Sequence, residues 1–250
     1  MKRMLFIAAA LLAGAAPQAW AQLSPDLIME SYNSNIQVIT SGIINKSVLD
    51  KAVARNASSA GRSTATKRST AATRSAAGAS TAYTPTAALR QQTVQGYTNR
   101  LKASNPTGAQ AVASVFGTGK YAYGQVYWGI VAGTGLRDND ATDALACYML
   151  LGWAIVHNKQ RDQDITAPMA RGVRAQVAPL LANNAQMRTR AAQVGEELKL
   201  QTVLVQGGWQ SAIREGKLAA YQQGVANLFK TQYGMDMSQF ELTSQGFAKR

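Results

Sequence analysis

Carboxylates are the side chains in this sequence whose spacing best suits chemistry. Asp138, Asp140 and Asp143 stand close together before an apolar run, and Glu197 stands four residues before Gln201. Residues four apart share one face of a helix. Two carboxylates in a cleft can serve as general acid and general base in glycoside hydrolysis. We therefore take Asp143 and Glu197 as candidate catalytic residues for hydrolysis of a cell-wall polymer.

The same carboxylates also have a structural interpretation, which we favour. Asp140 suits a helix N-cap, and Asp143 would then lie in the first turn, where a carboxylate meets the positive end of the helix dipole. Glu197 and Gln201 are common helix formers, and a surface pair of them needs no catalytic explanation. The catalytic interpretation stays open as an alternative.

Other kinds of site have too few suitable residues. The chain has one histidine, His157, and one cysteine, Cys147, ten positions apart, which is too few soft ligands for zinc. Asp143 and Met149 stand where an EF-hand loop needs glycine and glutamate. A Ser-His-Asp site would depend on His157, and no G-x-S-x-G motif accompanies it. We expect no metal ion and no cofactor, and we expect Cys147 to be buried.

The net charge favours anionic partners. Lys and Arg number 26 against 13 for Asp and Glu, which gives a formal net charge of +13. Residues 22–250 keep 24 basic and 13 acidic residues, hence +11. Such a charge suits lipopolysaccharide, acidic lipid or an acidic cell-wall polymer, although solubility alone is a sufficient alternative explanation.

Residues 1–21 have the features of a secretory signal peptide. Lys2 and Arg3 form a basic start, residues 5–16 are apolar, and Ala19-Trp20-Ala21 is a cleavage site of the A-x-A type. The apolar run is too short to span a bilayer. We expect cleavage after Ala21, a periplasmic or secreted protein, and no transmembrane segment in the mature chain.

Residues 56–82 have the composition of a disordered basic linker. They consist mostly of Ala, Ser, Thr and Gly with four basic residues, no acidic residue and no large apolar residue before Tyr83. Such a segment buries too little apolar surface to offset the entropy of ordering. Its basic residues are candidate anion-binding residues, and a solvated spacer is the alternative. Because aromatic residues are lacking, we expect no specific nucleic-acid binding. The candidates are Arg62, Lys67, Arg68 and Arg74.

The remaining segments predict an all-α protein, a multi-helix bundle around one buried helix. Residues 22–55 form an N-terminal helical segment that begins at Ser24-Pro25-Asp26, although residues 36–44 fit helix or strand. Residues 83–250 form the α-helical domain. Its central helix covers about 140–157, because that run is apolar nearly all round. Further helices are expected to begin at Thr84-Pro85, Asn105-Pro106, near Tyr121, at Thr166, at Met187 and at Lys217.

Several segments from Leu136 onward resemble a family of secreted bacterial proteins known as a domain of unknown function. They are the run NDATDALACY, Gly152-Trp153, Glu196-Glu197-Leu198 with Gln201, and YGMDMSQFELTSQGF near the C-terminus. The resemblance covers about residues 84–247. It implies an α-helical fold and an exported protein, and it transfers no catalytic residue.

Three functions fit the sequence. The favoured one is a non-enzymatic exported helical domain that binds or scaffolds at the bacterial cell envelope. The alternatives are a hydrolase acting on an envelope polymer and a secreted effector that acts through its cationic arm. A deep cleft holding two carboxylates would favour the hydrolase.

Overall fold

The computed structural model describes residues 24–33, 80–118, 120 and 122–250. These residues form nine α-helices, two short 3-10 helices and one β-hairpin, so the predicted all-α fold class is confirmed. None of the described helices is long and apolar enough to cross a membrane. The α-helices are α2 (Pro25–Asn33), α4 (Ala87–Lys102), α5 (Pro106–Phe116), α6 (Tyr123–Val131), α7 (Ala141–Val156), α8 (Ala167–Ala182), α9 (Ala185–Thr189), α10 (Ala191–Arg214) and α11 (Leu218–Tyr233).

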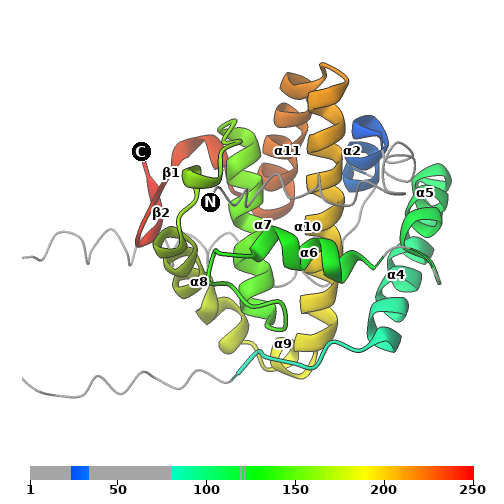
Figure 1. The fold of residues 1–250 in the computed structure, drawn as a ribbon, viewed down its shortest axis with the longest axis horizontal. Helices are drawn as coiled ribbons and strands as arrows, with labels where there is room; N and C mark the ends of the chain where they lie inside the picture. Colours follow the sequence, from blue (N-terminus) through cyan, green and yellow to red (C-terminus); the bar gives the residue numbers. More distant parts are fainter. Residues whose placement is uncertain (1–23, 34–79, 119, 121) are drawn as a thin grey trace, which may run out of the picture.

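The predicted central helix is α7, and every residue in it except Val156 is buried. The Asp140 side chain caps it by accepting hydrogen bonds from the backbone N–H groups of Thr142 and Asp143, at 2.9 and 3.2 Å. Helix α10 packs along α7 through the middle of the molecule (Figure 1). A helix that is apolar nearly all round requires such enclosure.

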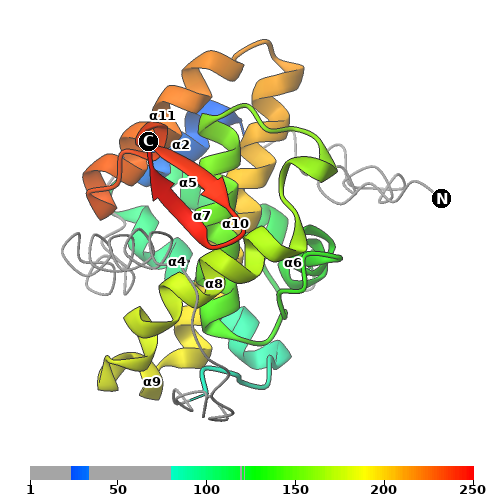
Figure 2. The same ribbon diagram turned by 90° about the vertical axis from the view of Figure 1, so that its left-hand side faces the viewer.

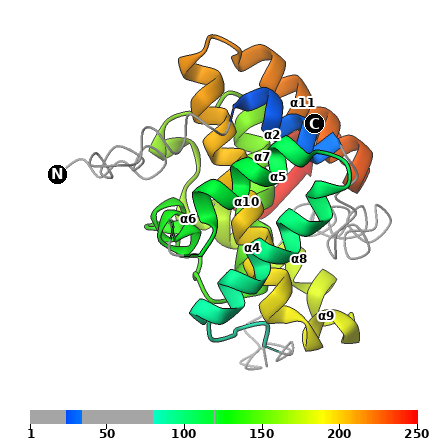
Figure 3. The same cartoon turned by 90° about the vertical axis from the view of Figure 1, so that its right-hand side faces the viewer.

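Helices α4 and α2 pack directly against the other side of α10 (Figure 3). Helix α5 packs against both α4 and α2. The long helix expected from Met187 is divided in two. Asn184 caps α9 by accepting from the backbone N–H of Met187, and α10 starts afresh after Arg190. Near the C-terminal end of α10, the apolar side chain of Ile213 is 37% exposed.

Most helix start signals lie where the sequence predicted them. Ser24 accepts a hydrogen bond from the backbone of Leu27 at 3.2 Å, and Asn105 accepts one from Gly108 at 2.7 Å. Gly234 ends α11 with a φ of 65°, a left-handed conformation that glycine adopts without strain. The expected start at Thr84-Pro85 is wrong, because Thr86 caps α4 instead.

The C-terminal tail packs back on the bundle as a β-hairpin, although the sequence predicted no strand in this segment. Strands β1 (Phe240–Thr243) and β2 (Gly246–Lys249) pair antiparallel, with Leu242 opposite Phe247. The hairpin lies over α7 and α8 (Figure 2). The Gln176 side-chain amide donates to the Phe247 carbonyl and accepts from the Phe247 N–H, both at 2.9 Å. The amide therefore satisfies both backbone hydrogen-bonding groups of Phe247, as a neighbouring strand would.

Residues 80–82, which the sequence assigned to the linker, lie in the described part of the chain and pack at the start of α7. Thr81 is buried, and its carbonyl accepts a hydrogen bond from the Ala141 N–H at 3.1 Å. The Thr81 hydroxyl donates to Asp140 Oδ1 at 2.7 Å. Residues 80–82 thus belong to the cap of α7. The predicted signal peptide, the ambiguous stretch 36–44 and residues 56–79 of the predicted linker lie outside the described residues.

Candidate functional site

Asp143 lies at the head of α7 and is held by two arginines. Its Oδ2 accepts hydrogen bonds from the Arg137 backbone N–H at 3.0 Å and from Arg137 Nε at 2.9 Å. Its Oδ1 accepts from Arg174 Nε. The Asp143 side chain is 1% exposed, so no substrate can reach it without displacing these partners. Asp143 therefore neutralises and fixes the arginines rather than acting as an accessible base.

Glu197 lies elsewhere, on the face of α10 that meets α4. Its Oε1 accepts a hydrogen bond from Arg100 Nη2 at 2.7 Å and one from Gln201 Nε2 at 3.5 Å. Burial raises the pKa of Glu197, and the Arg100 guanidinium opposes that rise. A pocket of about 210 Å³ opens beside this pair. The residues that line it are Leu89, Gln92, Thr93, Gly96, Arg100, Gln193 and Glu197.

Asp143 is absent from that lining, so the two candidate catalytic carboxylates do not share a cleft. The Glu197 pocket contains one carboxylate alone. Among the described residues, no group of three His, Cys, Asp or Glu side chains is placed to hold a metal ion. Cys147 is buried, and burial raises the pKa of its thiol to about 12, which leaves it protonated and unreactive at neutral pH.

Sequence reasoning missed a buried ion pair one residue away from Glu197. Glu196 and Lys199 lie on α10, and both residues are fully buried. Lys199 Nζ donates to Glu196 Oε1 at 2.5 Å and to the Asp138 carbonyl at 2.8 Å. Two tyrosine hydroxyls also donate hydrogen bonds to the Glu196 carboxylate: Tyr83 to Oε1 at 2.9 Å and Tyr123 to Oε2 at 2.6 Å.

Arg90 is the third charge in this cluster. Its Nε lies 3.6 Å from Glu196 Oε2, too far for a hydrogen bond, and its side chain is 31% exposed. Within the described part of the chain, its guanidinium makes no hydrogen bond. The guanidinium rests on Gly124 of α6, where a Cβ atom would come within 2.9 Å of Arg90 Cζ. The glycine therefore lets the arginine lie flat on the helix.

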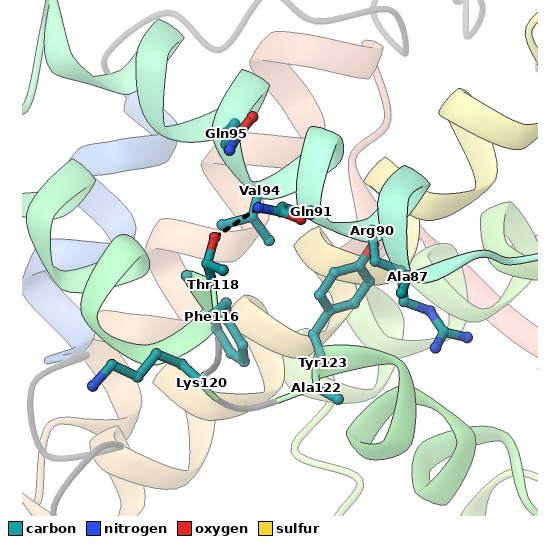
Figure 4. Close-up of a pocket in the computed structure, with 11 residues that line it drawn as sticks. Ala87, Arg90, Gln91, Val94, Gln95, Phe116, Thr118, Lys120, Ala122 and Tyr123 are labelled. Atoms are coloured by element: carbon teal, nitrogen blue, oxygen red, sulfur yellow. Dashed lines mark hydrogen bonds between the residues drawn. The ribbon is translucent and has the colours of Figure 1, made fainter.

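A second pocket, of about 250 Å³, begins at Arg90 and lies between α4 and the segment that links α5 to α6. Val94, Phe116 and Tyr123 supply apolar and aromatic surface. Arg90 and Lys120 lie at opposite ends, with the two rings between them (Figure 4). The Gln91 amide donates to the Thr118 hydroxyl at 2.8 Å and so ties the two walls together.

Two sets of sequence-predicted residues thus have different outcomes. Asp143 and Glu197 are located, and each is paired with arginine in a separate network. The anion-binding candidates lie outside the described residues and stay a prediction. They are Arg62, Lys67, Arg68 and Arg74.

Comparison with known proteins identifies a family but no activity. A search of curated proteins found no match, and a search of solved structures found none either. One family model matches residues 1–250, a wider range than the expected 84–247. The chain therefore belongs to the family described as "Family of unknown function (DUF6683)".

Proposed function

We propose that this protein is exported and that it binds or scaffolds at the bacterial cell envelope without catalysing a reaction. Export is inferred from the basic start, apolar run and A-x-A site of residues 1–21. The partner we propose is an anionic envelope component, because residues 22–250 carry 24 basic and 13 acidic residues.

The observation that supports a non-enzymatic function is the state of the two candidate carboxylates. Asp143 is closed in by Arg137 and Arg174, and Glu197 is paired with Arg100. A glycosidase needs two carboxyl groups on either side of the bond that it cleaves. Since the Glu197 pocket offers one, this arrangement favours binding over hydrolysis.

The linker charges are the proposed contacts with the anionic surface. Residues 56–82 carry four positive charges and no negative charge. A basic residue near an acidic lipid surface contributes about 1 kcal/mol at physiological salt. Four such residues acting together would therefore strengthen binding on the order of a thousandfold.

Vesicle sedimentation tests this proposal with the full chain. Binding is expected to vesicles that contain phosphatidylglycerol and to those that contain lipopolysaccharide, and not to pure phosphatidylcholine vesicles. It should weaken as salt rises, because exposed charges are screened. A fourfold variant should lose most of the binding: Arg62→Gln, Lys67→Gln, Arg68→Gln and Arg74→Gln.

A second fourfold variant of equal net charge controls for the loss of charge itself. It removes four exposed basic residues of the folded domain and should retain most of the binding. Equal binding to neutral and acidic vesicles would contradict an anionic partner, and equal loss in both variants would contradict a role for the linker. The control changes are Lys102→Gln, Arg171→Gln, Arg188→Gln and Lys230→Gln.

The hydrolase remains a second candidate because of one observation, the pocket beside Glu197 together with the raised pKa of that carboxyl. A carboxyl whose pKa is raised, at a pocket wall, suits a general acid. The full chain incubated with purified peptidoglycan should release no soluble fragments. Release that Glu197→Gln abolishes would replace the binding proposal with the hydrolase.

A further inference from the structure

We propose that the pocket between α4 and the α5–α6 segment binds a small organic carboxylate with an apolar body, and that Arg90 receives the carboxylate. This site is independent of the proposed envelope binding, which depends on the linker charges. Three properties of the pocket lead to this ligand class: its apolar lining, the free donors of Arg90 and its net charge.

The lining suits an apolar body. Val94, Phe116 and Tyr123 are all buried, with 4% of the residue exposed at most. The rings of Phe116 and Tyr123 meet edge to face, with centroids 6.3 Å apart and planes at 86°. Ligand pockets commonly combine such apolar walls with a few polar groups that fix orientation. A volume of about 250 Å³ is smaller than that of drug-sized ligand sites, so the ligand must be small.

Arg90 offers the polar contact. A guanidinium carries five N–H donors in a planar fork that matches a carboxylate. In the described part of the chain none of these donors makes a hydrogen bond, although the side chain is only 31% exposed. A partly buried guanidinium without acceptors gains more from an added anion than a fully solvated one, because water satisfies it less completely.

The local charge agrees with an anionic ligand. Among the described residues, Arg90 forms an ion pair with Glu196 alone, at 3.6 Å, and Lys199 binds the same carboxylate more closely, at 2.5 Å. Glu196 is therefore shared between two cations, and Arg90 is the more distant of them. Lys120 adds a second positive charge at the far end of the pocket, and no carboxylate lines the pocket (Figure 4). An uncharged ligand would leave these charges unmatched.

The test is a titration of the full chain, followed by ligand-detected NMR, with three anions that share a carboxylate on an apolar body. Benzoate represents a free aromatic acid, hexanoate an acyl chain, and N-acetylphenylalanine the C-terminus of a peptide. At least one should bind, and the tightest identifies the source of the natural ligand. Benzamide, which has the shape of benzoate without its charge, should bind at least tenfold more weakly.

Two variants locate the site. Arg90→Gln removes the charge and should weaken binding of the tightest anion at least tenfold. Ala87→Leu adds bulk at an exposed helix position that lines the pocket, and should weaken binding without altering the folded core. Arg171→Gln, at an exposed arginine of α8, is the matched control and should leave affinity within twofold.

The proposal is overturned if none of the three anions binds, or if benzamide binds as tightly as benzoate. It is also overturned if Arg90→Gln and Ala87→Leu both retain the affinity of the parent. Circular dichroism melting of each variant separates loss of the fold from loss of the site. Failure of vesicle binding would leave these results unaffected, because no vesicle is present in the titration.

Discussion

Replacing Lys199 by methionine tests whether the buried ion pair holds α10 in place. Methionine has a similar length and no charge, so it preserves volume while removing the ammonium. Glu196 then loses its closest partner, at 2.5 Å, and the Asp138 carbonyl loses its donor at 2.8 Å. The Glu196 carboxylate itself remains fully buried.

The expected cost follows from what remains around the carboxylate. Removing one partner of a buried ion pair typically costs about 3–5 kcal/mol. Here Tyr83 and Tyr123 still donate to Glu196, and Arg90 stays 3.6 Å away. We therefore expect the lower end, about 3 kcal/mol. In a domain of this size each kcal/mol lowers the melting temperature by about 2–4 °C, so Tm should fall by about 6–12 °C.

Chemical denaturation followed by circular dichroism gives the free energy of unfolding for Lys199→Met, Glu196→Gln and the double variant. The double variant should be more stable than the sum of the single changes predicts, by about 1–3 kcal/mol, because the two residues interact directly. Lys217→Met, which breaks exposed pairs with Asp26 and Glu215, should leave the midpoint unchanged. A Lys199→Met midpoint equal to that of the parent would refute the reasoning.

Three further predictions concern α7 and its C-terminal end. Trp153→Ala should cost about 3–5 kcal/mol in denaturant unfolding, because the buried indole stacks on His157 and donates to a hairpin carbonyl at 3.0 Å; a cost below 1 kcal/mol would contradict this. Cys147 should react with a thiol reagent quickly only in denaturant, since burial raises its pKa to about 12; fast native labelling would contradict burial. Burial, together with the nearby charges of Arg250 and Lys159, lowers the pKa of His157 in the folded state. The unfolded state therefore binds a proton more readily, and acidification below about pH 6.5 favours unfolding. Between pH 7.5 and pH 5 the parent should therefore lose more Tm than His157→Gln does, and equal losses would contradict the shift.

Local signals made the helices predictable. Asp140, Asn105 and Gly234 each act within four residues of their own position, through a cap or a left-handed turn. The burial of α7 was also predictable, because a run that is apolar nearly all round allows no exposed face. Trp153 is buried within this helix, and its indole N–H donates to the Phe240 carbonyl of the C-terminal hairpin.

The hairpin and the buried pair depend on partners far away in sequence. Strands of four residues carry too little alternation to be recognised, and β2 is held by Gln176, some 71 residues earlier. Glu196 and Lys199 stand three apart, as a surface pair would, and Tyr83 reaches them from 113 residues away. The run from Val194 to Val205 contains Glu196, Glu197, Lys199, Gln201 and Thr202, so its pattern alone does not distinguish a buried face from an exposed one.

The pocket between α4 and the α5–α6 segment could not be predicted from the sequence, because it depends on how Arg90 packs on Gly124. That contact gives the final prediction. A Cβ at Gly124 would lie 2.9 Å from Arg90 Cζ and Nε and 3.2 Å from Nη2, so Gly124→Ala must displace the guanidinium. The displaced atoms end a flexible side chain, and alanine favours a helix over glycine by up to about 1 kcal/mol, so stability should stay level or rise.

Anion binding should respond in the opposite direction. The guanidinium is displaced from its place at the end of the pocket, so affinity for the tightest of the three anions should fall severalfold. Gly129→Ala is the matched control on the same helix, because a Cβ there meets nothing within 4 Å. It should stabilise α6 comparably and leave affinity unchanged. Melting and NMR titration measure the two effects separately. If both alanine variants bind the anion as the parent does, the guanidinium has no role in the pocket; if both lose affinity equally, binding responds to α6 as a whole and not to Arg90.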